Sequence, residues 1–384
     1  MPTIQRMNGF EVCVRGAGAV GMSLALALSR QGLRVALQQD PARDVALGGE
    51  PPMGPASDIR TYALNAGSVR LLSDLKVWGA IPTDARTPLY DMHVCGDGAG
   101  AVLHFSAFEQ GLDVLAWIVD AAELEIALAA ALRFAPHVER VDQPVSADLL
   151  AIAEGRFAPS AATLGVQFTR QPYAQRAIAA RLESDTPHAG LARQWFGAPD
   201  VLALLPFDRP APGRSFGLVW SVPDQRAEEL LALAPAAFEQ ALMDASGGAA
   251  GPLRLASERV AWPLQWARAE PLCGPGWVLL GDAAHVVHPL AGQGLNLGLA
   301  DVSSLVRVLA ARESYRGIGD EKLLRRHVRE RELPTRAMGL VTDGLLQLFA
   351  QPSAPARELR NRGLSLLNSL SPLKKWIAAQ AAHS

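Results

Sequence analysis

The sequence predicts an α/β protein, α+β overall, with a Rossmann-like domain, an inserted antiparallel sheet and C-terminal helices. Three patterns predict this fold. A glycine-rich turn at 16–21 lies between a short apolar strand and a helix, and residues 215–220 alternate as in an antiparallel sheet. Residues 338–349 then carry apolar side chains at helical spacing. With 384 residues and 49% hydrophobic content, the chain can bury more than one core.

The glycine-rich turn has the spacing of a dinucleotide-binding turn. Gly16 would make the tight bend, Gly18 would let a pyrophosphate approach the backbone, and Gly21 would let the helix pack on the strand. The free N–H groups and the dipole of the helix N-terminus would then hold the negative charge. The acid expected at the end of the second strand is replaced by Gln39, whose amide can still bind a ribose hydroxyl. An ordinary glycine turn is the alternative.

A second turn follows a buried strand at 278–280. The strand leads into Gly281 and Asp282, and the segment from His288 to Gly294 leads into an amphipathic helix that begins near Leu295. A carboxylate at the carboxyl end of a strand lies in the crevice where open α/β sheets bind ligands. Asp282 is therefore a candidate ligand-binding residue, with helix capping as the alternative.

The segment from Gly281 to Asp301 resembles the second FAD motif of the aromatic hydroxylases. The sequence of this segment is similar to the corresponding motif of the ubiquinone-biosynthesis family of single-component flavoprotein monooxygenases. These enzymes have a p-hydroxybenzoate hydroxylase-like fold. The resemblance covers nearly the whole chain. Further matching residues include Asp58, Arg60, Ala63, Leu64, Ser68, Tyr173, Gln175, His188, Trp195, Trp220, Arg329, Thr342 and Asp343.

This resemblance implies a set of cofactor-binding residues. Asp282 would hold the ribityl chain of FAD, and Arg60 would reach the pyrophosphate or ribityl region, although a surface ion pair is the alternative for Arg60. The turn that would face the reactive side of the flavin contains Pro289, Gly292 and Gln293, which are our candidate catalytic residues. The cofactor-binding set is Gly16, Gly18, Gly21, Gln39, Arg60, Glu154, Asp282, Gly292, Gly294, Leu295 and Asn296.

A third family motif is altered. The family places Asp-Gly at the end of a strand, where it is thought to touch FAD and the nicotinamide cofactor, and this chain has Glu154 and Gly155. Glu154 keeps the negative charge of the family's aspartate, but its longer side chain places the carboxylate farther from the backbone. Reduction of the flavin by NAD(P)H is therefore the step that the sequence supports least.

Charge and cysteine content exclude several classes of protein. The net charge is -2, and the densest basic stretch, 325–331, is interleaved with glutamates, so we interpret it as a solvated helix face and expect no nucleic-acid partner. Three widely separated cysteines fit a reducing compartment. His285 and His288 lack a third ligand nearby, so we expect no metal and interpret both as packing or hydrogen-bonding residues.

The motifs predict a discontinuous domain organisation. We expect an FAD-binding domain from 1–86, 115–160 and 262–330, a substrate-binding β-sheet domain from 87–114 and 161–261, and a C-terminal helical segment at 331–384. No apolar signal core or membrane-spanning run occurs, which predicts a cytoplasmic protein. The last helix, around Trp376, packs on the body or touches the inner membrane or a biosynthetic complex.

The expected activity is hydroxylation of an aromatic ring. The resemblance implies an enzyme that uses FAD, NAD(P)H and O2, with a small hydrophobic aromatic substrate, by family analogy a polyprenylated phenol. The apolar stretch from Val201 to Phe207 is a candidate wall for this substrate. Two alternatives are a non-catalytic flavin-binding subunit of a biosynthetic complex, suggested by Gln39 and Glu154, and an FAD-dependent oxidoreductase of other chemistry.

Overall fold

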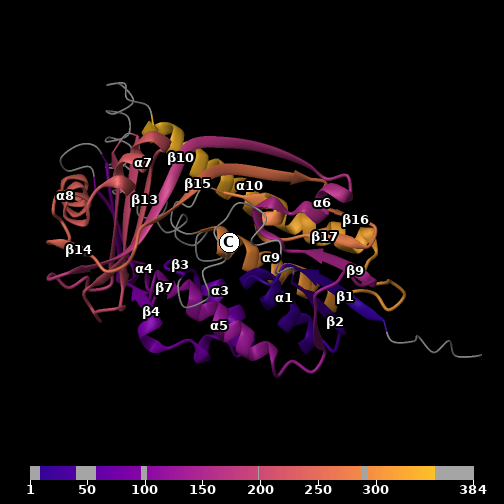
Figure 1. Ribbon diagram of the computed structural model, residues 1–384. Coiled ribbons are helices and arrows are strands. Elements are labelled where there is room, and N and C mark those ends of the chain that lie inside the picture. The colour runs from indigo at the N-terminus through magenta and orange to yellow at the C-terminus, as the bar shows by residue number, and fades with distance from the viewer. Residues whose placement is uncertain (1–8, 40–57, 97–101, 198, 288–292, 351–384) are drawn as a thin grey trace, which may run out of the picture.

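The computed structural model describes residues 9–39, 58–96, 102–197, 199–287 and 293–350. These residues form a six-stranded, a nine-stranded and a three-stranded sheet with helices packed on them (Figure 1). The mixture of parallel and antiparallel sheets confirms the fold class that the sequence predicts.

The six-stranded sheet has the order β16-β17-β9-β1-β2-β8. Its pairs are parallel except for β16 with β17. The strands read as apolar runs, with Val12 and Val14 both fully buried, because helices cover the sheet. Its elements are β1 (Phe10–Arg15), β2 (Val35–Gln38), β8 (Val138–Val141), β9 (Ala147–Ile152), β16 (Cys273–Gly274), β17 (Trp277–Leu279), α1 (Ala19–Arg30), α5 (Ala121–Leu132) and α9 (Gln293–Ala310).

The nine-stranded sheet has the order β18-β15-β10-β13-β12-β11-β5-β6, with β14 paired to β10. Trp220 and Phe238 pack against each other between this sheet and helix α8, with ring centroids 5.9 Å apart. The elements are β5 (Asp91–Cys95), β6 (Val102–Ser106), β10 (Gln167–Ser184), β11 (Leu191–Gly197), β12 (Asp200–Phe207), β13 (Ser215–Pro223), β14 (Leu253–Leu255), β15 (Val260–Glu270), β18 (His285–Val286), α7 (Asp224–Ala232) and α8 (Pro235–Ser246). The strand expected at 215–220 is confirmed as part of β13, which pairs antiparallel with β10 and β12.

A small third sheet joins the two larger ones. It has the order β3-β7-β4 and consists of β3 (Thr61–Leu64), β4 (Arg86–Leu89) and β7 (Ala116–Asp120). Helix α3 (Ala66–Asp74) follows β3 and is capped by Asn65, whose side chain accepts from Ser68 N–H. The remaining elements are α4 (Ala107–Gln110), α6 (Pro159–Thr163), η2 (Trp78–Ala80), η3 (Thr83–Ala85), η4 (Gly155–Phe157) and η5 (Gly281–Ala283).

Two long strands connect the parts of the molecule. β10 and β15 pair over most of their length and extend from the nine-stranded sheet across the top of the six-stranded one (Figure 1). Residues 262–270, which we had placed in the FAD-binding domain, therefore lie in the second sheet. The reason is that they pair with β10 from Gln167 onward.

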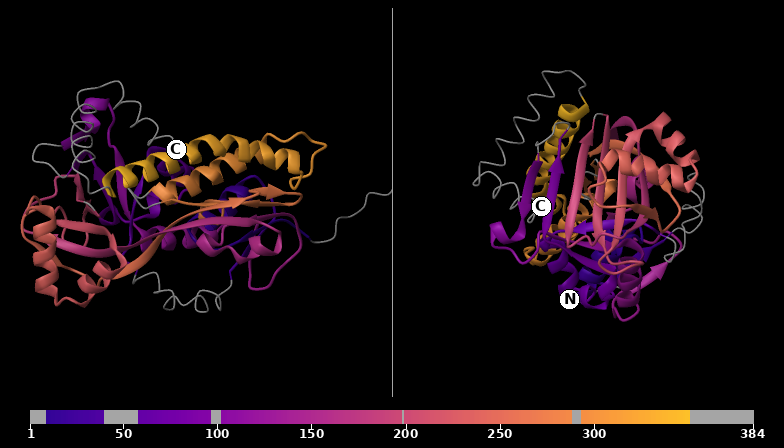
Figure 2. Two further views of the ribbon diagram at one scale, coloured as in Figure 1. Left: turned by 90° about the horizontal axis from the view of Figure 1, so that it is seen from above. Right: turned by 90° about the vertical axis from the view of Figure 1, so that its left-hand side faces the viewer.

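The C-terminal region begins earlier than the sequence suggested. Helix α10 (Glu321–Ala350) runs without a break through the expected boundary at 330, although Pro334 lies inside it. It packs along α9, and Figure 2 shows the two helices side by side. The segment around Trp376, with its expected membrane or complex contact, lies outside the described residues.

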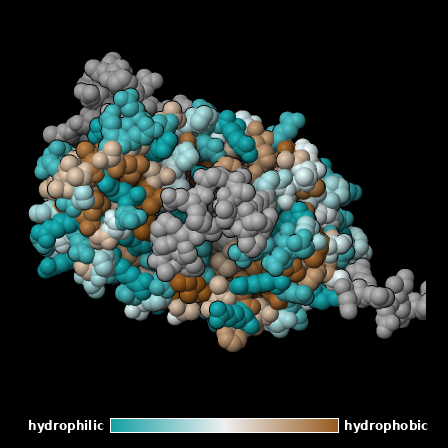
Figure 3. Space-filling model, in the orientation of Figure 1, coloured by the Kyte–Doolittle hydropathy of each residue, from teal (hydrophilic) through white to brown (hydrophobic). Residues whose placement is uncertain are grey.

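Hydrophobic side chains on the face seen in Figure 3 are interspersed with hydrophilic ones. Among the described residues, no helix combines the length and the apolar character needed to cross a membrane.

Candidate active site

The first glycine turn has the close contacts that its spacing predicts. Gly16 has φ +107°, and a Cβ there would lie 2.2 Å from the Ala153 carbonyl oxygen. A Cβ on Gly21 would lie 1.8 Å from the carbonyl oxygen of Gly16. Gly18, by contrast, is the N-cap of α1, and a Cβ there would meet nothing within 4 Å. The turn is thus tightly packed on two sides and open at the helix N-terminus, where a diphosphate would bind.

The second turn lies directly against the first. A Cβ on Gly281 would come 3.3 Å from Val20 Cγ2, and a Cβ on Gly298 would come 2.6 Å from the same atom. A Cβ on Gly294 would lie 3.9 Å from Asp282 Oδ1, so the start of α9 also faces this carboxylate. Two segments more than 250 residues apart therefore converge on one crevice at the carboxyl ends of β1 and β17.

Asp282 is solvent-exposed, yet protein atoms closely surround its carboxylate. Desolvation by the surrounding protein raises its pKa, whereas the positive charges of His285, Arg156 and Arg60 act in the opposite direction. Arg156 was missed by the sequence analysis. Its position two residues after Glu154 was the available signal, since the end of β9 is adjacent to the end of β1.

Arg60 forms an ion pair within its own loop. Its Nε donates to Asp58 Oδ1 at 2.9 Å, and its guanidinium lies 5.9 Å from the ring centroid of Tyr62. Burial acts to lower the pKa of Arg60, but Tyr62 and Asp58 raise it above its ordinary value. The guanidinium is 42% exposed and interacts with the charge on Asp282, so contact with a cofactor phosphate stays a prediction.

Glu154 is hydrogen-bonded to the next helix. Its carboxylate accepts from Ser160 Oγ at 2.8 Å and from Ser160 N–H at 3.1 Å, near the N-terminus of α6. Arg15 Nη1 donates to the same Ser160 Oγ at 3.0 Å, which explains an arginine at the end of a buried strand. The described contacts thus show a structural role for Glu154 beside the glycine turn, and its contact with FAD or NAD(P)H stays a prediction.

Asn296 uses its side chain to hold α9 against the β3–α3 turn. Its Oδ1 accepts from Asn65 N–H at 3.0 Å and from Ser68 Oγ at 2.7 Å, and its Nδ2 donates to the Ala63 carbonyl at 2.7 Å. The side chain is 1% exposed. The described contacts thus show a structural role for the Asn296 side chain, and its contact with a cofactor stays a prediction.

A buried ionic network lies behind the crevice. Asp301 Oδ2 accepts from Gly281 N–H at 2.9 Å and pairs with His285 Nε2 at 2.9 Å, while Oδ1 accepts from Arg331 Nε at 2.8 Å. Burial acts to raise the pKa of Asp301, but His285 and Arg331 hold it well below its usual range. Burial acts to lower the pKa of His285, but Asp301 raises it. Each group therefore shifts the pKa of the other in the direction that favours an ion pair between His285 and Asp301.

This network corrects one interpretation of the basic stretch. Arg331, which we had assigned to a solvated helix face, is 8% exposed and pairs with the buried Asp301. The glutamates interleaved with the arginines led us to interpret the whole stretch as solvated. In the helix, however, the spacing of the residues places Arg331 on the side that faces α9. Neither Asp301 nor Arg331 was identified as a site residue from the sequence.

The remaining site residues lie at the edges of the crevice. Gln39 is exposed after β2, and its N–H donates to the Val141 carbonyl at 3.2 Å. Gln293 is the first residue of α9, and Leu295 packs against the large core of the six-stranded sheet. Pro289 and Gly292 lie outside the described residues. Within the described ranges, no group of three metal-ligating side chains occurs.

The crevice fits a dinucleotide with a polyhydroxylated linker. Gly18 leaves open space at a helix N-terminus, and Asp282 offers a carboxylate that can accept hydrogen bonds from hydroxyl groups. Arg60 and Arg156 supply positive charge close to Asp282. These features together define a flavoprotein of the FAD-binding class.

Comparison with known proteins identifies the family. Residues 120–341, more than half of the chain, match the model of the FAD binding domain family, and the chain belongs to that family. It is similar to ubiquinone hydroxylase UbiL of Rhodospirillum rubrum, at 29% identity over 97% of this chain and 89% of the relative. It is also similar to 3-demethoxyubiquinol 3-hydroxylase of Escherichia coli, at 29% identity over 95% of this chain and 96% of the relative.

Solved structures agree on the fold. PqsL, a probable FAD-dependent monooxygenase from Pseudomonas aeruginosa, superimposes with a TM-score of 0.75 and 20% identity. The match covers 93% of this chain and 100% of PqsL. The arrangement of sheets described above is therefore that of the FAD-dependent monooxygenases.

Proposed function

We propose that this protein is an FAD-dependent monooxygenase that uses NAD(P)H and O2 to hydroxylate an aromatic ring. The observation that carries the proposal is the convergence of the Gly16–Gly21 turn and the Gly281–Asp282 turn on one crevice. Full-length similarity to ubiquinone hydroxylases supports the reaction type.

Different residues of the crevice would bind different parts of the cofactor. The N-terminus of α1 at Gly18 would bind the diphosphate, and Asp282 would accept hydrogen bonds from the ribityl hydroxyls. Arg60 and Arg156 would add positive charge near the phosphates. The N-terminus of α9, from Gly294, would favour the negative charge that reduction places on the flavin.

When bound, the flavin supplies hydride acceptance and the activation of oxygen. The protein has to position the aromatic ring and keep water away. Asp301 contributes by hydrogen bonding to Gly281 N–H, directly before Asp282, and to His285, three residues after it. The side chain of Asp282 is thereby held at the crevice.

We propose a polyprenylated phenol of ubiquinone biosynthesis as the substrate, on the strength of the relatives named above. The stretch Val201–Phe207 is a poor wall for it. Val201, Leu202, Leu204 and Phe207 are each at most 6% exposed, because β12 is covered on both faces by the cores of the nine-stranded sheet.

The decisive experiment compares wild type with Asp282→Ala and with the exposed control Asp84→Ala. Purified wild type should carry yellow flavin and oxidise NAD(P)H faster when a polyprenyl phenol is added, with hydroxylated product. Asp282→Ala should lose flavin while Asp84→Ala keeps it. Full flavin retention in Asp282→Ala contradicts the cofactor assignment. Flavin that binds but never turns over with any phenol favours the non-catalytic subunit.

A further inference from the structure

A second hollow is lined in part by strand β18. It has a volume of about 370 Å³ and is enclosed by β10, β15, β18, α9 and α10. This volume is within the range of pockets that hold small organic molecules. None of its lining residues belongs to the Gly16–Gly21 turn or is Asp282, although Asp301 and His285 link it to the Gly281–Asp282 turn.

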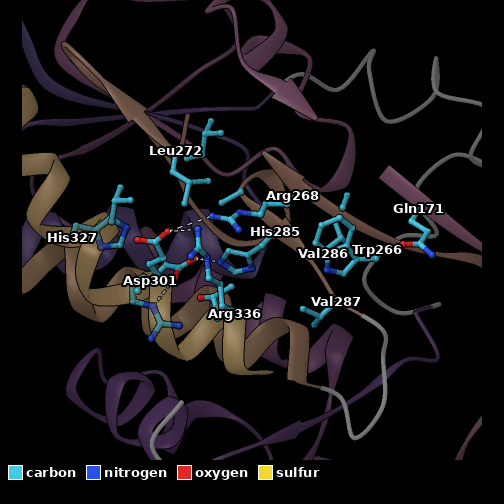
Figure 4. Close-up of a pocket in the computed structure, with 17 residues that line it drawn as sticks. Gln171, Trp266, Arg268, Leu272, His285, Val286, Val287, Asp301, His327 and Arg336 are labelled. Carbon is cyan, nitrogen blue, oxygen red and sulfur yellow. Dashed lines mark hydrogen bonds and ion pairs between the residues drawn. The ribbon is translucent and has the colours of Figure 1, made fainter. Parts of the chain in front are cut away.

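The hollow has two chemically different ends. Figure 4 shows Arg268, Asp301, His285 and Arg336 gathered at one end. At the other end lie the residues with mainly apolar or uncharged side chains, Trp266, Val286, Val287 and Gln171. Such a site matches a ligand that has a polar head and an apolar body.

Positive charge exceeds negative charge at the polar end. Three arginines, Arg268, Arg331 and Arg336, face two carboxylates, Asp301 and Glu332. Glu332 Oε1 is shared, lying 3.5 Å from Arg268 Nη2 and 2.6 Å from Arg336 Nη2. Each guanidinium has five N–H donors, so one shared oxygen satisfies only a small part of them.

Two further groups strengthen the preference for an anion. His285 lines the hollow, and Asp301 raises its pKa against the effect of burial, whereas burial lowers the pKa of His327 to about 4. Thr335 Oγ1 also lines the hollow, and it is buried without a hydrogen-bond partner among the described residues. A buried hydroxyl without a partner is costly unless a ligand or water satisfies it.

We propose that this hollow binds a small organic anion with an apolar body, of the arylalkanoate class. The carboxylate lies between Arg268 and Arg336, and the body lies along Trp266 and Val286. A carboxylate there gains charge-assisted hydrogen bonds from planar guanidiniums, and the aromatic body replaces water on apolar surface. This inference is independent of the reaction proposed above.

Isothermal titration of the FAD-loaded protein tests the charge preference. Phenylbutyrate and phenylbutanol are matched probes that differ in the carboxylate. We expect one saturable site for the acid and binding of the alcohol at least about tenfold weaker, because charge-assisted hydrogen bonds are lost. Equal affinity for the two probes, or binding of neither, overturns the proposal.

Substitutions locate the site. Val328→Phe fills the hollow and should abolish binding of both probes. The Arg336 side chain is 54% exposed. Arg336→Gln should weaken the binding of phenylbutyrate by about three- to tenfold and leave the affinity for phenylbutanol unchanged. Arg325→Gln on the same helix is the control, since Arg325 pairs with Glu321 and does not line the hollow.

Flavin content and thermal unfolding of each variant show whether it is folded. If Val328→Phe does not fold, Arg336→Gln still decides the question, because its exposed side chain can be changed without opening a core. Acid binding that is unaffected by Arg336→Gln, or equally weakened by Arg325→Gln, refutes the placement. The calorimetric readout requires no turnover, so it is distinct from failure of the hydroxylase assay.

Discussion

Replacing Asp301 by Asn should destabilise the protein strongly and weaken flavin binding at the same time. The carboxylate is 2% exposed and joins three partners from three segments, Gly281, His285 and Arg331. An amide of the same shape can still accept from one or two of these donors, but it leaves the charge of Arg331 buried and unopposed. Removing one partner of a buried ion pair costs about 3–5 kcal/mol.

The cost for Asp301→Asn should lie at the lower end of this range, about 3 kcal/mol, because the amide keeps part of the hydrogen bonding of the carboxylate. Denaturant unfolding followed by tryptophan fluorescence measures the free energy of unfolding. Flavin fluorescence in the same preparation measures the dissociation constant of FAD. Asp84→Asn is the matched control, since Asp84 pairs with Arg209 at a site that is 53% exposed and should cost less than about 1 kcal/mol.

The reasoning fails if Asp301→Asn costs no more than the control. It also fails in part if stability falls while FAD affinity is unchanged, because Asp301 is then not coupled to Asp282 through Gly281. Affinity and stability that fall together are the expected result.

Three other changes test separate features. Gly21→Ala should cost about 1–3 kcal/mol and expel FAD, because its Cβ would lie 1.8 Å from the Gly16 carbonyl oxygen; normal flavin content and stability would contradict this. Burial lowers the pKa of His327 to about 4. His327 therefore contributes stability that is fully present above about pH 6.5, the ordinary pKa of histidine, and that is lost as the pH falls toward 4. In wild type the free energy of unfolding should fall by about 3 kcal/mol over this pH range, and in His327→Leu this fall should be absent. If the variant keeps the pH profile of wild type, His327 is not the source of the fall. Ser160→Ala should cost about 1 kcal/mol, because Arg15 and Glu154 lose their shared hydroxyl, and an unchanged unfolding midpoint would argue against that bridge.

The fold class could be predicted because its signals are local. A strand, glycine turn and helix at 10–30 follow from apolar runs and glycine spacing alone, and β1 and α1 lie where the pattern places them. The family resemblance also implied that the Gly16–Gly21 turn and Asp282 bind one cofactor, and the approach of Gly281 to Val20 brings these two turns together.

The polar network could not be predicted from such patterns. Arg331 lies in a stretch of mixed charge whose composition is the same whether the helix face is solvated or buried. Its pairing with Asp301 depends on how α10 lies along α9, which is a tertiary property. The pairing of residues 262–270 with β10 could not be predicted for a related reason, because a strand does not show which sheet it will join.

The pairing of β10 with β15 has one discontinuity. The register shifts between Pro172 and Arg176, and Ala174 within it has φ +53°. On the Arg176 side of this irregularity β10 also pairs with β13, and on the Pro172 side β15 pairs with β18. Such an irregularity disrupts the ladder and bends the strand locally, so a substitution that restored regular pairing here would change the direction in which the ribbon continues.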